Sequence, residues 1–378
     1  MQKLTGFGFQ PATTQPITAA ADSGNVFSFS TSTTSSTEAA NNPLVAFTAA
    51  QPKPEGVNVG ISDDFRFGDK SSSTKPGSST HAFRASRTNS PFSFPVRKQT
   101  LESQWRDVDW TEEQKTSLMK TVSSYKPSCE EVTGARVLLL GPVGSGKSSF
   151  ISSVQSVFNG RVTNWAMVGS SSTSFTKKLQ SFNIHAQRGE SPTGLVLCDI
   201  MGLADGEMTG LTLHDTLSVI KGHVPEGHKF CPDQPVSCET VGYVKKPSLK
   251  DKIHCVAFIV DISKIMSYPK GLVTTFQHLR EHISDLGVHQ VALLTHVDQI
   301  CPETAKDASQ VYKSPIIKEM IDKAGALLGM STSYILPVKN YSSELDLDVN
   351  TDVLLLSAVD HILQYANLYF QDNVRAQR

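Results

Sequence analysis

An apolar run that leads directly into a glycine-rich turn is the feature that most limits the fold of this chain. The residues VLLL at 137–140 are followed by GPVGSGKS at 141–148 and then by a helix-compatible segment that ends near Phe158. The spacing G-x-x-x-x-G-K-S between a buried strand and a helix is typical of a phosphate-binding loop. We therefore expect a phosphate-binding turn at the carboxyl end of the first strand of an α/β domain.

Each residue type in this turn has a part in phosphate chemistry. The glycines allow the backbone to curl so that successive N–H groups face phosphate oxygens. Lysine at position 147 can reach the β- and γ-phosphates, and the hydroxyl of Ser148 can bind Mg²⁺. The predicted ligand is a nucleoside diphosphate or triphosphate with Mg²⁺. The predicted phosphate-binding residues of the turn are Gly141, Gly144, Ser145, Gly146, Lys147, Ser148 and Ser149.

An aspartate and a glycine follow the apolar run LVLC, which predicts a second strand of the same site. Asp199, at the end of that run, can hold Mg²⁺ through water, and the N–H of Gly202 can contact a γ-phosphate. The Ser/Thr-rich segment 169–176 is expected to supply a threonine for Mg²⁺ and the γ-phosphate. Thr173 is the preferred candidate and Thr176 is the alternative. The predicted metal ligands are Ser148, Asp199 and Thr173.

The sequence THVD at 295–298 directly follows the apolar run VALL and predicts recognition of a base. In regulatory GTPases this position carries N/T-K-x-D, whose carboxylate accepts two hydrogen bonds that guanine can donate and adenine cannot. Asp298 is the predicted acceptor, with His296 in the place of the usual lysine and Thr295 beside it. Lys339 lies in the loop after the last predicted strand, PVKNY at 337–341, whose backbone N–H groups are expected to contact the guanine O6. The predicted cofactors are GTP or GDP with Mg²⁺.

The residue after the D-x-x-G sequence indicates slow catalysis. Ras-like enzymes use a glutamine there to orient the attacking water, whereas this chain has Leu203. No catalytic residue can be assigned from the sequence, and any GTP hydrolysis is expected to be slow. A non-hydrolysing, nucleotide-stabilised scaffold or interaction protein remains an alternative. An ATPase is a third interpretation, because the glycine-rich turn and Asp199 also fit a Walker pair, but Asp298 argues against it.

Apolar runs alternate with amphipathic segments from Arg136 onward, which predicts a mostly parallel sheet covered by helices on both faces. The expected strands are Arg136–Leu140, Phe182–Gln187, Leu195–Asp199, Ile253–Val260, Val291–Thr295 and Ile335–Val338. The expected helices of this region are Lys147–Phe158, Leu211–Ile220, Thr274–Asp285, Ser314–Leu328 and Thr351–Tyr369. The strand that begins at Phe182 is expected at the edge in antiparallel orientation, so that the fold class is a three-layer, Ras-like P-loop fold.

Composition divides the chain into three parts. Residues 1–94 are rich in Ser, Thr, Pro and Gly and are expected to be a disordered tail. Residues 95–130 are expected to form a helical clamp on the main domain, with Thr111 as the cap of its helix. Residues 131–372 are expected to form the nucleotide-binding domain.

The net charge and the cysteine content exclude several classes of protein. The net charge of −1 argues against a protein that coats nucleic acid, and no apolar run is long enough to span a bilayer. The six cysteines are too sparse for a disulfide framework, which predicts reduced thiols in a cytosolic or nuclear protein. Protein partners and self-association are expected but not identified by the sequence.

A long insertion at 221–251 has no explanation in nucleotide chemistry. It contains the spacing H-x4-H-x2-C-x6-C, which fits no standard zinc ligand pairing closely. A turn-rich surface loop that docks a partner is the preferred interpretation. The four metal-ligand candidates are His223, His228, Cys231 and Cys238.

The chain resembles the interferon-induced protein 44 and 44-like family over roughly residues 100–370. The residues that carry this resemblance are Trp105, DWTE at 109–112, SYKP at 124–127, the glycine-rich turn at 141–148 and THVD at 295–298. The resemblance implies a Ras-like P-loop fold, guanine nucleotide binding, a cytoplasmic location and a part in the interferon-driven antiviral response. Some members of the family carry an N-terminal TLDc-type domain where this chain has its Ser/Thr-rich segment.

Overall fold

The computed structural model describes residues 100–166, 176–186, 192–203 and 210–376, with side chains up to residue 373. The chain divides into two compact units, Met1–Arg87 and Thr88–Arg378, and all described residues belong to the second. The tail predicted at 1–94 lies outside the described residues, as does most of the Ser/Thr-rich segment that contains Thr173.

A six-stranded sheet forms the centre of the second unit, with the strand order β2-β3-β1-β4-β5-β6. Strand β2 pairs antiparallel with β3 at one edge, and every other neighbouring pair is parallel. This order confirms the predicted Ras-like P-loop fold, including its antiparallel edge strand. The strands are β1 Ala135–Leu140, β2 Gln180–His185, β3 Pro192–Asp199, β4 Cys255–Asp261, β5 His289–Thr295 and β6 Ile335–Pro337.

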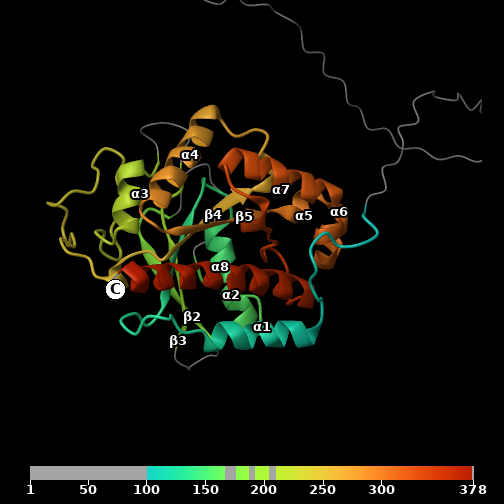
Figure 1. Cartoon of the computed structure of the whole chain (residues 1–378). Coiled ribbons are helices and arrows are strands. Elements are labelled where there is room, and N and C mark those ends of the chain that lie inside the picture. Colours follow the sequence, from blue (N-terminus) through green and yellow to red (C-terminus); the bar gives the residue numbers. More distant parts are fainter. Residues whose placement is uncertain (1–99, 167–175, 187–191, 204–209, 377–378) are drawn as a thin grey trace, which may run out of the picture. The chain divides into compact units, whose positions relative to one another are not determined.

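Helices cover both faces of the sheet (Figure 1). Helices α2 and α8 pack on one face and helices α3, α4 and α7 on the other, which buries β4 along its whole length. The helices are α1 Glu112–Ser124, α2 Lys147–Asn159, α3 Leu213–Ile220, α4 Lys270–Asp285, α5 Val297–Ile300, α6 Pro302–Lys306, α7 Pro315–Leu328 and α8 Val349–Ala376. Short 3₁₀ segments are η1 Leu249–Asp251, η2 Ile262–Lys264, η3 Ala308–Lys313 and η4 Thr332–Tyr334.

Helix ends differ from the sequence expectation where a cap decides the boundary. Helix α3 begins two residues later than expected because the hydroxyl of Thr212 accepts the N–H of Asp215 at 3.0 Å. Helix α4 begins four residues earlier than expected, directly after Pro269. Such ends depend on a single side chain or backbone angle, and a periodicity over a longer window does not locate them.

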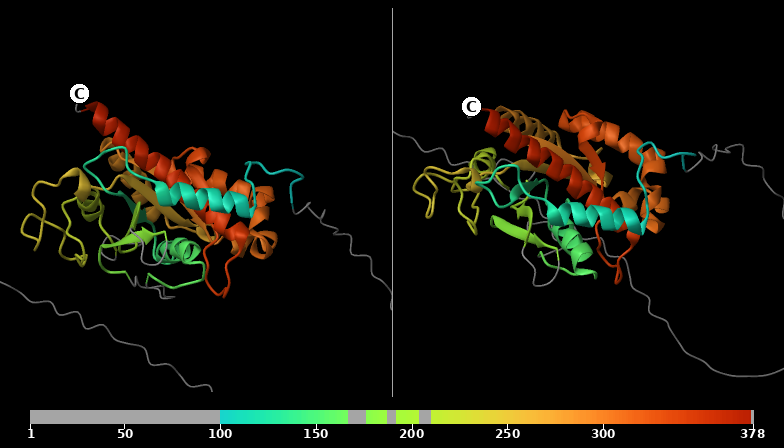
Figure 2. Two further views of the ribbon diagram at one scale, coloured as in Figure 1. Left: turned by 90° about the horizontal axis from the view of Figure 1, so that it is seen from below. Right: turned by 60° about the horizontal axis from the view of Figure 1, so that its bottom comes forward.

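Helix α1 lies beside α8, as both views in Figure 2 show. Its amino end is capped as predicted, since the Thr111 hydroxyl accepts the N–H of Gln114 at 3.1 Å. The segment before the helix packs on η3, where the rings of Trp105 and Tyr312 meet edge to face at 4.9 Å. The guanidinium of Arg106 donates to the carbonyl of Ile335 at 2.8 Å. Residues 101–125 are therefore tied to the core of this unit by ring packing and hydrogen bonds.

A buried histidine stands at the start of β4. His254 is fully buried, and its Nδ1 accepts the N–H of Arg136 at 2.9 Å. Its Nε2 therefore carries the proton, and it lies 2.9 Å from the carbonyl oxygen of Leu249. Burial lowers the pKa of His254 to about 4, so the ring is neutral in the folded protein at neutral pH.

His254 is expected to make the protein less stable in mild acid. Between pH values of about 6.5 and 4 the unfolded chain binds a proton that the folded ring does not, so stability falls as the pH falls. At pH 5 this amounts to about 2 kcal/mol of unfolding free energy. We expect His254→Gln to remove about that much from the difference between urea unfolding at pH 7 and pH 5. The control is His278→Gln on the exposed surface of α4; an unchanged pH dependence in His254→Gln would refute this assignment.

No helix in the described ranges is both long enough and apolar enough to cross a membrane.

Candidate nucleotide-binding site

The glycine-rich turn connects β1 to α2 through two residues in the left-handed region. Gly144 has a φ of 73° and Gly146, the amino-terminal cap of α2, has a φ of 91°. A Cβ on Gly141 would lie 2.0 Å from the carbonyl oxygen of Ile259, so only glycine fits between β1 and β4. The turn therefore depends on its glycines for its backbone geometry, as a phosphate-binding loop does. Ser149 is half-buried in the first turn of α2.

Lys147 lies buried over this turn. Its ammonium donates to the carbonyl oxygens of Gly141 at 3.0 Å and Pro142 at 2.9 Å. Burial lowers the pKa of Lys147 to about 8, while the charge of Asp199 acts in the opposite direction. A phosphate would supply the negative charge that this buried ammonium lacks.

Three oxygen-bearing side chains meet where β3 ends. The hydroxyl of Ser148 donates to Oδ2 of Asp199 at 2.6 Å, and the hydroxyl of Thr176 donates to the same oxygen at 3.2 Å. The two hydroxyl oxygens lie 3.5 Å apart. Hydroxyl and carboxylate oxygens are hard donors of the kind that Mg²⁺ prefers. Ser148 and Asp199, two of the three predicted metal ligands, thus lie together, and Thr176 joins them; Thr173 lies outside the described residues.

The segment after Asp199 is hydrogen-bonded to the glycine-rich turn. The N–H of Leu203 donates to the carbonyl of Gly141 at 3.0 Å, and the N–H of Val143 donates to the carbonyl of Leu203 at 3.3 Å. A Cβ on Gly202 would lie 2.9 Å from the backbone nitrogen of Val143, so the two segments touch. The side chain of Leu203 is buried. It can neither donate to nor accept from a water molecule at the phosphate.

The THVD sequence joins the end of β5 to the glycine-rich turn. Thr295 is fully buried, and its hydroxyl donates to the carbonyl of Ser145 at 2.7 Å. His296 is the one described residue other than glycine with a positive φ, 59°. Its Nδ1 lies 3.5 Å from Oδ1 of Asp261. Thr295 thus positions the turn through its side chain, while His296 is partly exposed beside it.

Asp298 is half-buried, and among the described residues no hydrogen bond or ion pair engages its carboxylate. It is a free acceptor at the edge of the site. Lys339, in contrast, donates to the carbonyl of Ala305 at 3.3 Å and lies 3.6 Å from a carboxylate oxygen of Glu344. Two residues predicted to bind the base therefore differ: the carboxylate of Asp298 is unpaired among the described residues, whereas the ammonium of Lys339 already has partners.

Asn340 was not among the predicted site residues, yet it contacts the glycine-rich turn. Its amide nitrogen donates to the carbonyl of Gly146 at 3.2 Å, and its amide oxygen is buried without a hydrogen-bond partner. Buried polar atoms without partners are uncommon and indicate a missing ligand or water. The only sequence signal was the position of Asn340 in the loop after the last strand.

The metal-ligand candidates of the insertion do not converge. In the part of the chain that the structure describes, no three histidine, cysteine or acidic side chains form a group that could hold a metal ion. The ring of His223 stacks on Tyr243 at 5.0 Å, and the ring of His228 packs edge to face on Phe230. Cys231 and Cys238 are exposed free thiols. The surface-loop interpretation of this insertion is therefore retained.

Comparison with known proteins gives one consistent result. The chain is 37% identical over 257 residues to interferon-induced protein 44 of Mus musculus, covering 68% of this chain and 60% of that protein. It is 35% identical over 267 residues to the Homo sapiens protein of the same name, covering 71% and 60% of the two chains. Interferon-induced protein 44-like of Homo sapiens is 36% identical over 261 residues, covering 69% and 58%. The chain thus spans about 60% of the length of these relatives. No protein-family profile matches it.

Solved structures give weaker similarities. Toc33 from Arabidopsis thaliana, in complex with GDP and Mg²⁺, is 15% identical with a TM-score of 0.37, covering 68% of this chain and 91% of that chain. Era from Aquifex aeolicus, bound to GDP and AlF4⁻, is 14% identical with a TM-score of 0.31, covering 61% and 56%. The assignment of the fold rests on the strand order described above.

Proposed function

We propose that this chain, a relative of the interferon-induced protein 44 and 44-like proteins, binds GTP and GDP with Mg²⁺ and hydrolyses GTP slowly if at all. The proposal concerns this chain alone, because the chain spans only about 60% of those relatives.

The observation that carries the proposal is that three chemically distinct groups lie at the carboxyl ends of the parallel strands. A buried ammonium, Lys147, lies at the turn after β1, and a cluster of three oxygen ligands around Asp199 lies at the end of β3. The unpaired carboxylate of Asp298 follows β5. Because neighbouring parallel strands end at the same edge, these groups can serve the phosphates, the metal and the base of one nucleotide.

The phosphates and the metal would be held by the groups near the turn. Lys147 and the backbone N–H groups of the turn would bind phosphate oxygens, and Ser148, Asp199 and Thr176 would hold Mg²⁺ directly or through water. The metal would neutralise part of the phosphate charge. Thr173 remains a second candidate for the metal, as the sequence analysis proposed. Gly202 would contact the γ-phosphate.

The base would be recognised chiefly by Asp298. Its carboxylate can accept from N1–H and the exocyclic amine of guanine, with His296 and the stem of Lys339 flanking the ring. The amide of Asn340 would complete the pocket beside Gly146. A half-buried carboxylate left without donors by adenine would disfavour ATP.

Hydrolysis distinguishes two possible functions, a slow GTPase switch and a scaffold that binds nucleotide without hydrolysing it. Buried, apolar Leu203 favours a protein in which nucleotide is a structural ligand, because it cannot orient water. A slow switch requires that a partner protein or the backbone supply the group that orients the attacking water. Measurement of phosphate release by the full chain with GTP and Mg²⁺ separates them: no release above buffer supports the scaffold, and slow release supports the switch.

The names of the relatives support induction by interferon, and the antiviral and cytoplasmic parts of the proposal rest on the family resemblance of the sequence. We propose that the protein is made in response to interferon, acts in the cytoplasm in antiviral immunity and works through protein partners. Its abundance in interferon-treated and untreated cells, with fractionation of those cells, tests the first two points. Equal abundance with and without interferon would refute the link to that response.

Asp298→Asn is expected to change base preference. In calorimetric titrations with Mg²⁺, we expect the full chain to bind GTP and GDP in preference to ATP. In Asp298→Asn, affinity for GDP should fall about 100-fold and affinity for xanthosine diphosphate should rise, because an amide can donate to the extra xanthine oxygen. Asp322→Asn, an exposed position on α7, is the matched control. Unchanged GDP affinity in Asp298→Asn would remove the base-recognition assignment.

A further inference from the structure

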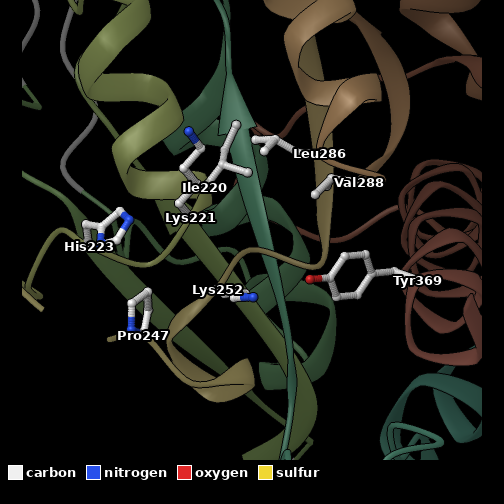
Figure 3. Close-up of a pocket in the computed structure, with 8 residues that line it drawn as sticks. All are labelled: Ile220, Lys221, His223, Pro247, Lys252, Leu286, Val288 and Tyr369. Atoms are coloured by element: carbon white, nitrogen blue, oxygen red, sulfur yellow. The ribbon is translucent and has the colours of Figure 1, made fainter. Parts of the chain in front are cut away.

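A cavity of about 290 Å³ lies near the amino ends of the parallel strands β4 and β5, at the end of the sheet opposite the candidate nucleotide site. It is bordered by the carboxyl ends of α3 and α4, by α8 and by the neck of the insertion (Figure 3). Val288 precedes β5, whereas Asp298 follows it. Since a strand of this length spans roughly 20 Å, the cavity is separate from the proposed nucleotide site.

The cavity has an apolar side and a polar side. Figure 3 shows Ile220, Leu286 and Val288 together on one side, with the ammonium of Lys221 beside Ile220. The ammonium of Lys252 and the hydroxyl of Tyr369 point toward each other on the opposite side. The volume is close to the lower end of the range of small-molecule sites, about 300 Å³. It is larger than an inorganic ion needs.

The charges that line the cavity have no counterions. Lys221 and Lys252 are its charged lining residues, and no acidic side chain lines it. Among the described residues neither lysine forms an ion pair. The acid next to Lys252 in sequence, Asp251, is occupied, since its carboxylate accepts the N–H and the hydroxyl of Ser248 at 2.8 and 2.6 Å. The cavity therefore carries uncompensated positive charge.

The two lysines are held in place by the neck of the insertion. The N–H of Ile253 donates to the carbonyl of Ile220 at 3.1 Å, which joins the outgoing and returning chains. Gly222, with a φ of 81°, leaves no room for a Cβ, because that atom would lie 2.8 Å from the carbonyl of Asp251. Lys221 and Lys252 thus stand on two backbone segments in direct contact.

We propose that this cavity binds a small organic anion, a carboxylate or phosphate ester with an apolar group, between Lys221, Lys252 and the Ile220–Leu286–Val288 wall. The charged end pairs with the ammonium of Lys252 and accepts from the Tyr369 hydroxyl, and the exposed ammonium of Lys221 adds positive charge beside the wall. The apolar end covers the wall and is removed from water. A mixed surface of this kind disfavours a neutral apolar ligand, which would leave the ammonium of Lys252 without a partner.

A pair of matched probes tests this proposal on the full chain. 8-Anilinonaphthalene-1-sulfonate has an apolar ring system and a negative charge, and N-phenyl-1-naphthylamine has the same rings without the charge. In fluorescence titrations we expect Lys221→Gln/Lys252→Gln to weaken binding of the sulfonate by about tenfold or more. Binding of the neutral amine should change little. Lys245→Gln/Lys246→Gln, two exposed lysines of the same insertion, should leave both unchanged.

Methyl NMR of the unmodified chain locates the probe. The sulfonate should shift the methyl signals of Leu286 and Val288. The proposal is overturned if the unmodified chain fails to bind the sulfonate below about 1 mM, if both double variants lose the same affinity, or if the Leu286 and Val288 signals do not move.

Discussion

Replacing Lys147 by alanine is expected to lower the affinity of the full chain for GDP and GTP by about 100-fold or more. The ammonium is buried, and among the described residues it donates hydrogen bonds to the carbonyls of Gly141 and Pro142. Those carbonyls are dipoles, whereas a phosphate is a full negative charge in a place that water hardly reaches. Charge-assisted hydrogen bonds are the strongest contacts that this site can form.

Lys323→Ala is the matched control, because Lys323 forms a surface ion pair with Glu319 on α7. Calorimetric titration should give this control the affinity of the unmodified chain. Urea unfolding without nucleotide must accompany the titration, since Lys147→Ala also removes two internal hydrogen bonds. A folded Lys147→Ala protein with unchanged GDP affinity would contradict the assignment of this turn as a phosphate-binding loop.

The parallel strands of the sheet could be predicted from the sequence because they contain continuous apolar runs. β4 is buried at every position and β3 at nearly all of them, and no other element type explains short runs of this kind between helices. The two shortest helices, α5 and α6, were not predicted. They comprise four and five residues, which is too short for a helical periodicity to appear.

The candidate site could be predicted where its residues lie at a fixed sequence distance from the end of a strand. The glycine-rich turn and Asp199 follow strand ends, so their positions depend on local geometry alone. Asn340 was not selected and Thr176 was only the alternative to Thr173, because their contacts with Gly146 and Asp199 join segments far apart in the chain. The burial of Thr295 against the carbonyl of Ser145 is a long-range contact of the same kind.

A buried ion pair links α1 to α8 and, through Tyr341, to the loop after β6. The ammonium of Lys115 in α1 lies 3.0 Å from Oδ2 of Asp352 in α8, and Asp352 is fully buried. Its other oxygen, Oδ1, accepts the hydroxyl of Tyr341 at 2.7 Å. The N–H of Tyr341 in turn donates to Ser153 in α2 at 2.9 Å. Tyr341, the residue after Asn340, is thus held by the carboxylate of Asp352, and within the described ranges the cation paired with that carboxylate is Lys115 of α1.

Lys115→Met is therefore expected to lower the free energy of unfolding by about 3 kcal/mol, because it leaves the buried carboxylate of Asp352 without a cation. In an Asp352→Asn background that carboxylate is absent, and the same change should cost about 1 kcal/mol or less. Urea unfolding of the two single variants and the double variant measures this difference. Lys120→Met, an exposed lysine on the same helix, should change stability by less than about 0.5 kcal/mol. Equal costs of Lys115→Met in the two backgrounds would show that Lys115 stabilises the protein through packing alone, and that its ammonium does not compensate a charge on Asp352.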